Sequence, residues 1–193
     1  MPRVPRNLQS GHVYHVINRG NGKAEVFHKP SDYEAFLDLL SAAKVRHSVK
    51  LFAFCLMPNH FHLVVEPETQ VSLSNFMQWL MTSHVRRYHQ HYESSGHIWQ
   101  GRFKSFPIQR DEHLITVLRY VRQNPVRAGL VATPQEWPWS SAKRVDPVDS
   151  PPVADVDVVE TELSSECLRE VRESVNRQRP FGSAEWQKAV LSG

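Results

Sequence analysis

Two histidines that are separated by one residue are the part of this sequence best suited to chemistry. Residues 61–65 are apolar and partly β-branched, which predicts a strand that begins directly after a turn at residues 57–59. Side chains alternate between the faces of a strand, so His60 and His62 should project from the same face. Such a pair can hold a divalent cation, although solvent-facing histidines and core histidines bonded to the backbone would give the same pattern.

A tyrosine and an asparagine further along the chain offer the other groups that cleavage of a phosphodiester needs. Residues 111–124 show helical spacing of apolar residues, which places Tyr120 and Asn124 on one helix face. A phenol oxygen can attack a phosphodiester when a metal polarises the phosphate and guanidinium groups absorb the developing charge. Two imidazoles and one amide oxygen leave positions open for phosphate and water, a set suited to Mg²⁺ or Mn²⁺. An ordinary half-buried tyrosine is the alternative for Tyr120.

Charge is distributed unevenly along the chain. The formal net charge is +3, but residues 83–130 hold eight Lys and Arg against three acids, a local net of +5. Residues 145–176 hold nine acids against two arginines, a local net of −7. The basic region indicates a polyanionic partner. The acidic segment could compete with that partner for the basic region.

Composition excludes several classes of protein. Cys55 and Cys167 are too few for a disulfide framework or a cysteine-based metal site, which fits a reducing cytoplasm. No window approaches the ~20 apolar residues of a membrane helix, and no apolar run follows the first residues, so we expect neither membrane insertion nor secretion. With 193 residues, 40% of them hydrophobic, the chain can bury a core of ordinary domain size.

The order of the predicted elements indicates an α+β fold. We expect strands at residues 11–18, 50–56, 60–65 and 98–108, and helices at about 31–47, 72–93 and 111–124. Ser31 and Glu34 have the spacing of a capping box, and Pro125 should stop the third helix at the preceding residue. This order matches a ferredoxin-like antiparallel sheet with helices on one face, which leaves the other face free for a ligand.

A change of composition divides the chain near residue 145. Residues 1–144 contain the predicted domain, and residues 145–193 form an acidic C-terminal extension. Residues 146–154 have the composition of a linker, and an acidic helix is predicted at about 160–177. The extension could restrain the basic site, pack on the edge of the domain or help to recognise a nucleic acid. We favour packing.

Together these residues resemble the single-tyrosine HUH transposases, in particular the REP-associated tyrosine transposases of bacteria. The matching motifs are Val-Ile-Asn-Arg-Gly-Asn at 16–21, Met-Pro-Asn-His-Phe-His-Leu-Val-Val at 57–65, Trp-Gln-Gly-Arg-Phe at 99–103, Tyr-Val-Arg-Gln-Asn-Pro-Val-Arg-Ala-Gly-Leu-Val at 120–131 and Trp-Pro-Trp-Ser-Ser at 137–141. They cover roughly residues 11–142 in the order of the family, and Arg-Pro-Phe-Gly at 179–182 resembles a C-terminal feature of this branch.

The resemblance implies an HUH endonuclease fold and a role for each site residue. His60 and His62 would bind the metal, with Phe61 as the hydrophobic residue between them. Asn124 would complete the site, where the wider family often has glutamine. Tyr120 would be the nucleophile that cuts single-stranded DNA, becomes joined to the 5′ phosphate and leaves a 3′ hydroxyl that can later reseal a strand. The implied substrate is a hairpin of repetitive extragenic palindromes on the bacterial nucleoid, and the implied reaction needs no nucleotide cofactor. We expect a cytoplasmic protein, and the long C-terminal extension favours a monomer over the dimers that are common elsewhere in the family.

Basic and aromatic side chains are the expected DNA contacts, because phosphates pair with cations and unpaired bases stack on rings. The candidates are Arg19, Asn21, Arg86, Arg87, Trp99, Arg102, Lys104, Arg119, Arg122 and Arg127. Trp99 would suit the core equally well, and Arg86 and Arg87 a solvated helix face. Two other functions stay open: a protein that grips DNA hairpins without cutting them, and a metal-dependent phosphodiesterase that uses water.

Overall fold

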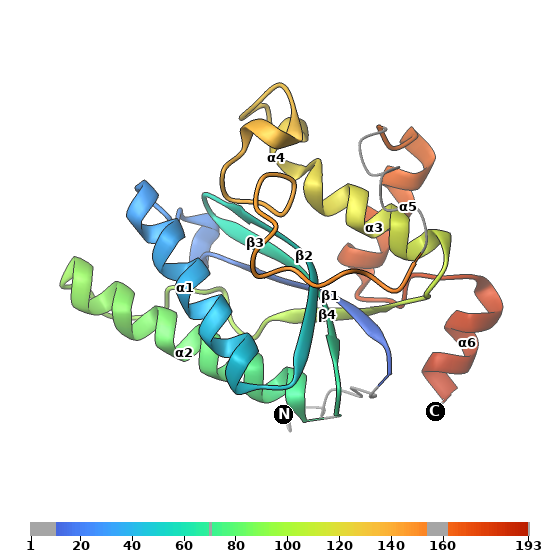
Figure 1. Cartoon of the computed structure of the whole chain (residues 1–193), viewed down its shortest axis with the longest axis horizontal. Helices are drawn as coiled ribbons and strands as arrows, with labels where there is room; N and C mark the ends of the chain where they lie inside the picture. Colours follow the sequence, from blue (N-terminus) through green and yellow to red (C-terminus); the bar gives the residue numbers. More distant parts are fainter. Residues whose placement is uncertain (1–10, 70, 154–161, 193) are drawn as a thin grey trace.

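A four-stranded antiparallel sheet lies at the centre of the computed structural model, which describes residues 11–69, 71–153 and 162–192 (Figure 1). The strands follow the order β2-β3-β1-β4 across the sheet, so β1 and β3 are the central pair. This order confirms the predicted α+β, ferredoxin-like class. The elements are β1 (Val13–Arg19), η1 (Asn21–Lys23), α1 (Pro30–Arg46), β2 (Val49–Met57), β3 (His60–Pro67), α2 (Ser72–Tyr92), β4 (Lys104–Ile108), α3 (Glu112–Arg122), α4 (Asn124–Arg127), η2 (Pro134–Glu136), α5 (Ser165–Arg177) and α6 (Ala184–Ser192).

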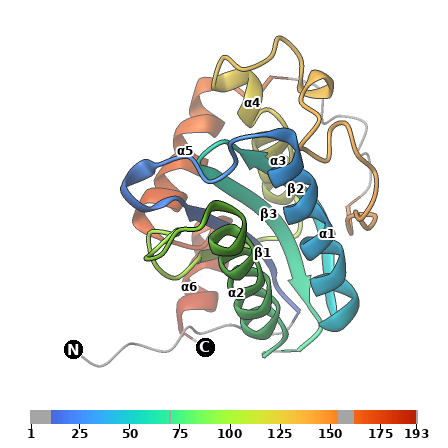
Figure 2. The ribbon, with the colours of Figure 1, turned by 90° about the vertical axis from the view of Figure 1, so that its left-hand side faces the viewer.

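Helices cover both faces of the sheet (Figures 1 and 2). The helices α1 and α2 pack on the face that carries Phe61, Leu63 and Val65, as expected. The helix α3, which we expected beside them, packs on the opposite face against β2 and β3. That face carries apolar side chains such as Phe52 and Val64, and burying them stabilises the fold. No helix in the described part of the chain is long and apolar enough to cross a membrane.

The start of α1 differs from the prediction. The helix begins at Pro30, and Ser31 lies inside its first turn instead of capping it. Proline suits this position because its fixed φ is helical and its missing N–H would have no partner there. The carboxylate of Asp32 accepts hydrogen bonds from the backbone N–H groups of His28 and Lys29, at 2.9 and 3.2 Å, and so takes over the capping role.

Two further boundaries differ. The fourth strand covers only Lys104–Ile108, because Gly101, at φ 133°, bends the chain before it. The acidic helix begins at Ser165, where the side chain of Ser164 accepts a hydrogen bond from the backbone N–H of Cys167. Its expected start at Glu160 lies outside the described residues.

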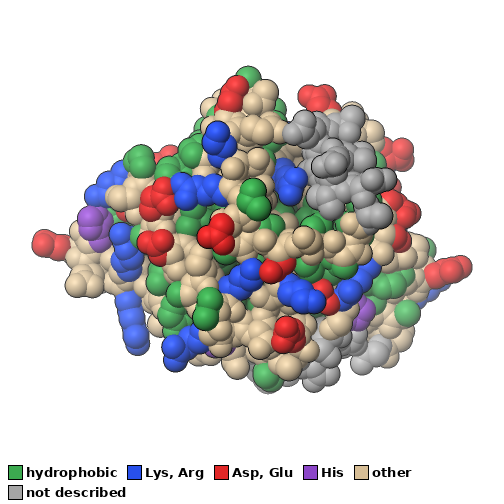
Figure 3. All heavy atoms as spheres, viewed as in Figure 1, with side chains coloured by type: hydrophobic (Ala, Val, Ile, Leu, Met, Phe, Trp, Pro, Cys, Tyr) green, Lys and Arg blue, Asp and Glu red, His purple; other side chains and the backbone are tan. Residues whose placement is uncertain are grey.

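The C-terminal extension packs against the sheet edge and α3. The backbone of Phe181 donates to the Pro107 carbonyl and accepts from the Gln109 N–H, both at 2.9 Å, so the chain adds a bridge to β4. Val171 of α5 is buried in the same core as α3. The acidic side chains of α5 face solvent, and Figure 3 shows acidic groups along the edge of the molecule where α5 and α6 lie.

A buried histidine should make stability depend on pH. His84 of α2 is 4% exposed, and its ring lies 5.3 Å from that of Trp99. Burial, followed by the charge of Arg87, lowers the pKa of His84 to about 4, against an opposing effect of Asp32. Between pH 6.5 and about 4 the unfolded chain therefore binds a proton that the folded chain does not. Acidification through this window should lower the free energy of unfolding by up to about 1.4 kcal/mol per pH unit for this group.

Urea denaturation near pH 7 and near pH 5 checks this prediction. His84→Phe should lose less stability on acidification than the parent chain does. His97→Phe, in the exposed loop after α2, is the control and should behave like the parent. An identical pH dependence in the parent and His84→Phe would contradict the prediction.

Candidate functional site

The β2–β3 hairpin presents His60 and His62 on the sheet face that α3 crosses. Their ring centroids lie 5.0 Å apart, with the planes at 80°. The carbonyl of Asn59, in the turn, accepts a 2.8 Å hydrogen bond from the N–H of Gly20, which anchors the turn to the end of β1. Glycine is required at position 20, because a Cβ there would lie 2.1 Å from the carbonyl oxygen of Ala24.

The helix α3 places Tyr120 across from these imidazoles. Its side chain is 8% exposed, and its ring centroid lies 5.8 Å from that of His62. Tyr120 and Asn124 do not share one helix as predicted, because α3 ends at Arg122 and Asn124 begins α4. Pro125 falls in the first turn of α4, where proline is favoured, so it follows the break and starts a new helix.

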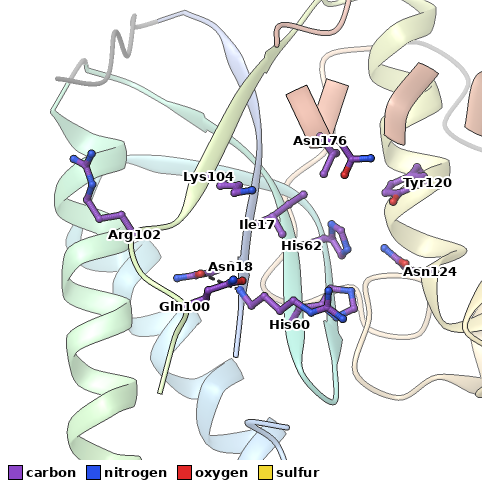
Figure 4. A pocket seen from close by; sticks show the side chains of 12 residues that line it. Ile17, Asn18, His60, His62, Gln100, Arg102, Lys104, Tyr120, Asn124 and Asn176 are labelled. Atoms are coloured by element: carbon purple, nitrogen blue, oxygen red, sulfur yellow. Dashed lines mark hydrogen bonds between the residues drawn. The ribbon is translucent and has the colours of Figure 1, made fainter. Parts of the chain in front are cut away.

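One pocket of about 490 Å³ brings the four predicted site residues together. Figure 4 shows Tyr120 and Asn124, from the helices, beside the rings of His60 and His62 on the strand. The lining residues are Ile17, Asn18, Arg19, His60, His62, Gln100, Arg102, Lys104, Tyr120, Asn124, Val175 and Asn176. The pocket is therefore built from β1, β3, β4, the loop before β4, α3, α4 and α5.

Burial keeps the histidines of this region neutral. Burial, with a smaller effect of the charge of Arg19, lowers the pKa of His60 to about 4. Burial is also the main reason that the pKa of His62 lies well below its ordinary value, and it lowers that of the neighbouring His15 to about 3. A neutral imidazole can bind a cation without first losing a proton.

The donor groups fit a divalent cation. His60 Nδ1 lies 2.7 Å from Asn59 Oδ1, which leaves its Nε2 for another partner. The amide nitrogen of Asn124 is buried, and among the described residues it has no hydrogen-bond partner. An amide whose nitrogen makes no hydrogen bond to the protein can turn its oxygen towards a ligand, so His60, His62 and Asn124 could supply two nitrogens and one oxygen.

A second group of donors lies at the start of α3. The ligand atoms of Asp111, Glu112 and His113 lie within 4.8 Å of one another. Asp111 is the N-cap of α3, and its carboxylate accepts hydrogen bonds from the backbone N–H and the ring of His113, at 2.9 and 2.7 Å. Helix capping explains this geometry, and the separation of nine positions between Asp111 and Tyr120 corresponds to about 14 Å of helix.

Arg127 of α4 covers the ring of Tyr120. Its guanidinium carbon lies 4.3 Å from the ring centroid, and its Nη2 donates to the Tyr120 carbonyl. Burial lowers the pKa of Arg127, and the neighbouring Tyr120 opposes that shift. A cation on an aromatic face is attracted by about 0.5–2 kcal/mol, and negative charge on the ring would strengthen the attraction.

The other predicted DNA contacts occupy several places. Arg19, Arg102 and Lys104 line the pocket, although Figure 4 shows Arg102 directed away from the imidazoles. Asn21 lies in η1, Arg119 and Arg122 lie on α3, and Arg86 and Arg87 lie on α2, away from the pocket lining. Trp99 is 5% exposed and packs 5.2 Å from Phe61, so its ring belongs to the core and offers no platform for a base.

Several pocket residues were not singled out from the sequence. Asn18 and Gln100 lie within recognised motifs, so the motifs contained the signal although the residues themselves were not chosen. The side chain of Asn18 donates to the Gly101 carbonyl at 3.1 Å and so ties β1 to the loop before β4. Val175 and Asn176 come from α5, and no local pattern predicted that this helix reaches the pocket.

Comparison with known proteins identifies the family of this chain. The chain belongs to the IS200-like transposase family, whose model matches residues 8–124. It is also 34% identical over 103 residues to a Haemophilus influenzae protein that is assigned as a REP-associated tyrosine transposase. That match covers 48% of this chain and 58% of the relative, so the chain spans less than two thirds of the relative's length. The predicted family resemblance is confirmed.

Solved structures support the fold. A REP-associated tyrosine transposase bound to a REP hairpin superposes with a TM-score of 0.61 at 19% identity, over 86% of this chain and 96% of that one. A Deinococcus radiodurans structure described as a transposase gives a TM-score of 0.45 at 19% identity, over 64% of this chain and 97% of that one. The first of these matches confirms the fold class.

Proposed function

We propose that this chain cuts and rejoins single-stranded DNA through a covalent intermediate on Tyr120. The observation that best supports this function is the meeting of a tyrosine with two neutral imidazoles in one pocket, with ring centroids 5.8 Å apart for Tyr120 and His62. The candidate metal ligands and the candidate nucleophile could therefore reach the same phosphate. Membership of a transposase family agrees with DNA as the substrate.

The reaction is a transesterification. The phenol oxygen of Tyr120 forms a bond to the scissile phosphorus, and the bond from phosphorus to the 3′ oxygen breaks. The phenol proton leaves to solvent, and the 3′ oxygen takes up a proton. Because the phosphotyrosine keeps the energy of the broken bond, attack by a 3′ hydroxyl can reseal a strand without a nucleotide cofactor.

The pocket residues divide the remaining tasks. His60, His62 and Asn124 would hold Mg²⁺ or Mn²⁺, which when bound polarises the phosphate and stabilises its developing charge. Arg127 lies on the Tyr120 ring, which places a positive charge beside the proposed nucleophile. Arg19 and Lys104 line the same pocket and offer positive charge to the DNA backbone.

The substrate class that we propose is a hairpin from repetitive extragenic palindromes with unpaired DNA at its foot. The assignment of the H. influenzae relative and the REP hairpin bound to the solved neighbour support this class. The local net charge of +5 over residues 83–130 agrees with a nucleic-acid partner.

A denaturing gel tests the proposed function. A 3′-labelled oligonucleotide with a palindromic hairpin is incubated with the full chain and Mn²⁺. We expect a labelled product of low mobility that protease treatment converts to a short DNA fragment. Cleavage without an adduct would favour the water-using phosphodiesterase, and binding without cleavage would favour the hairpin-binding protein. Either result would overturn the proposal.

Arg127→Met should slow formation of the adduct by about 10-fold, because it removes the cation from the Tyr120 ring and keeps a side chain of similar length. Single-turnover cleavage measures the rate, and fluorescence anisotropy measures hairpin affinity, which should change much less. Arg46→Met is the matched control, since it removes a cation 5.9 Å from the ring of Trp79 at an exposed site outside the pocket lining. An unchanged rate in Arg127→Met would show that the contact with Tyr120 does not assist the reaction.

The restraint hypothesis for the acidic extension can be tested without deleting it. Deletion of residues 145–193 would uncover the core around Val171 and Phe181, so a point change in α5 is more informative. If α5 restrains the pocket, Asn176→Ala should increase cleavage. The packing interpretation, which we favour, predicts an unchanged rate in the same assay.

A further inference from the structure

A third histidine lies behind the candidate metal ligands. His15 of β1 is 2% exposed, and its Nε2 lies 2.9 Å from Nδ1 of His62. The two rings are stacked, with centroids 5.1 Å apart and planes at 23°. In the pairing of β1 with β3, Ile17 lies opposite His62 and His15 opposite Val64, so the two histidines are diagonal neighbours on one face.

The hydrogen bond between the two rings decides which nitrogen of His62 is available to a ligand. A neutral imidazole has one N–H and one acceptor nitrogen, and a single proton lies between the two bonded nitrogens. If His62 carries its proton on Nδ1, it donates to His15 and its Nε2 has a free lone pair. If His15 donates instead, the proton of His62 is on Nε2, and that nitrogen cannot bind a cation.

His60 is held in a corresponding way by a different group. Its Nδ1 lies 2.7 Å from the side-chain oxygen of Asn59, which can only accept. The proton of His60 is therefore on Nδ1, and Nε2 is the acceptor. Both imidazoles of the candidate site thus have Nδ1 engaged within the protein, which is how metal-binding histidines are usually oriented.

The position of His15 suits an orienting role better than a ligand role. The ring is not part of the pocket lining, and Nε2, through which it contacts His62, is already engaged. Its other ring neighbours are Phe106 and Tyr120, at centroid distances of 6.1 and 6.0 Å. An apolar side chain could fill this space equally well. The feature that histidine adds is a ring nitrogen, Nε2, that can accept a hydrogen bond from His62.

We propose that His15 is a positioning residue that holds His62 in the tautomer whose Nε2 can bind a metal. The proposal rests on the proposed function, because it takes His62 as a ligand. Removing the acceptor should let the His62 proton move to Nε2 and let the ring rotate. Partners of this kind typically change metal affinity by about 10- to 100-fold.

The first test measures the affinity of the full chain for Mn²⁺. The electron paramagnetic resonance signal of free Mn²⁺ reports how much of the ion is bound. His15→Phe keeps a ring but removes the acceptor, and it should weaken Mn²⁺ binding by about 10- to 100-fold. His15→Gln can place its side-chain oxygen near the position of Nε2 and should recover most of the affinity. His84→Phe, a buried histidine in the other core, is the matched control and should bind Mn²⁺ like the parent.

Nitrogen NMR of the metal-free parent protein shows which ring nitrogen of His62 carries the proton. This measurement does not require any variant to fold. The parent should show the His62 proton on Nδ1, and His15→Phe should shift it towards Nε2. A His62 proton on Nε2 in the parent would overturn the proposal. So would parent-like Mn²⁺ affinity in His15→Phe.

His62→Ala separates failure of this proposal from failure of the proposed function. If His62→Ala binds Mn²⁺ as tightly as the parent, His62 is not a ligand and both proposals fall. If His62→Ala loses Mn²⁺ binding while His15→Phe retains it, only the positioning role of His15 is refuted.

Discussion

Tyr120→Phe is expected to abolish the covalent protein–DNA adduct and to lower strand cleavage by about 1,000-fold or more, because it removes the oxygen that we propose forms the new bond to phosphorus. The ring and its contacts with Arg127 and His62 should persist, since a phenylalanine ring fills the same space. Hairpin affinity should therefore stay within about 2-fold of the parent. The adduct is measured on a denaturing gel and the affinity by fluorescence anisotropy.

Tyr88→Phe is the matched control for this prediction. Tyr88 is a partly exposed tyrosine of α2 whose phenol oxygen lies 2.8 Å from Nε2 of His28, away from the pocket lining. Its replacement should leave adduct formation unchanged. An adduct that survives in Tyr120→Phe would assign the nucleophile to another residue and would refute the proposed mechanism.

His60→Ala is expected to reduce both Mn²⁺ affinity and cleavage by at least about 100-fold. His60 is a better test than His62 because it is only partly buried, so its truncation leaves a smaller cavity. Chelation of the metal from the parent should have the same effect on cleavage. Isothermal titration calorimetry with Mn²⁺ and the gel assay provide the two measurements.

His113→Ala distinguishes the two candidate metal sites, the pocket and the donor group at the start of α3. If the metal binds at His60, His62 and Asn124, His113→Ala should keep both Mn²⁺ affinity and cleavage. Loss of Mn²⁺ binding in His113→Ala but not in His60→Ala would place the cation at Asp111, Glu112 and His113 and would contradict our assignment.

Local patterns were sufficient to predict most of the elements and the histidine pair. The four strands and the three helices of the domain follow from periodicities of two and 3.6 residues, and the shared face of His60 and His62 follows from the strand between them. A sequence motif of about ten residues also identified Tyr120 and Asn124 as candidate site residues. Some element ends were wrong, such as the start of α1, where Pro30 and Asp32 replaced the expected cap. The single helix expected to carry Tyr120 and Asn124 was also wrong, because α3 ends at Arg122 and Asn124 begins α4.

Contacts between distant segments required the tertiary structure. The sequence alone determined which side chains are available for the proposed metal-assisted transesterification. It also determined the strand and the helices that carry them. Only the folded chain decided that α3 crosses the histidine face, that His15 bonds to His62 and that Asn176 reaches the pocket. The physical reason is that strand register and the choice of sheet face depend on apolar surface contributed by many separate segments, which no local periodicity encodes.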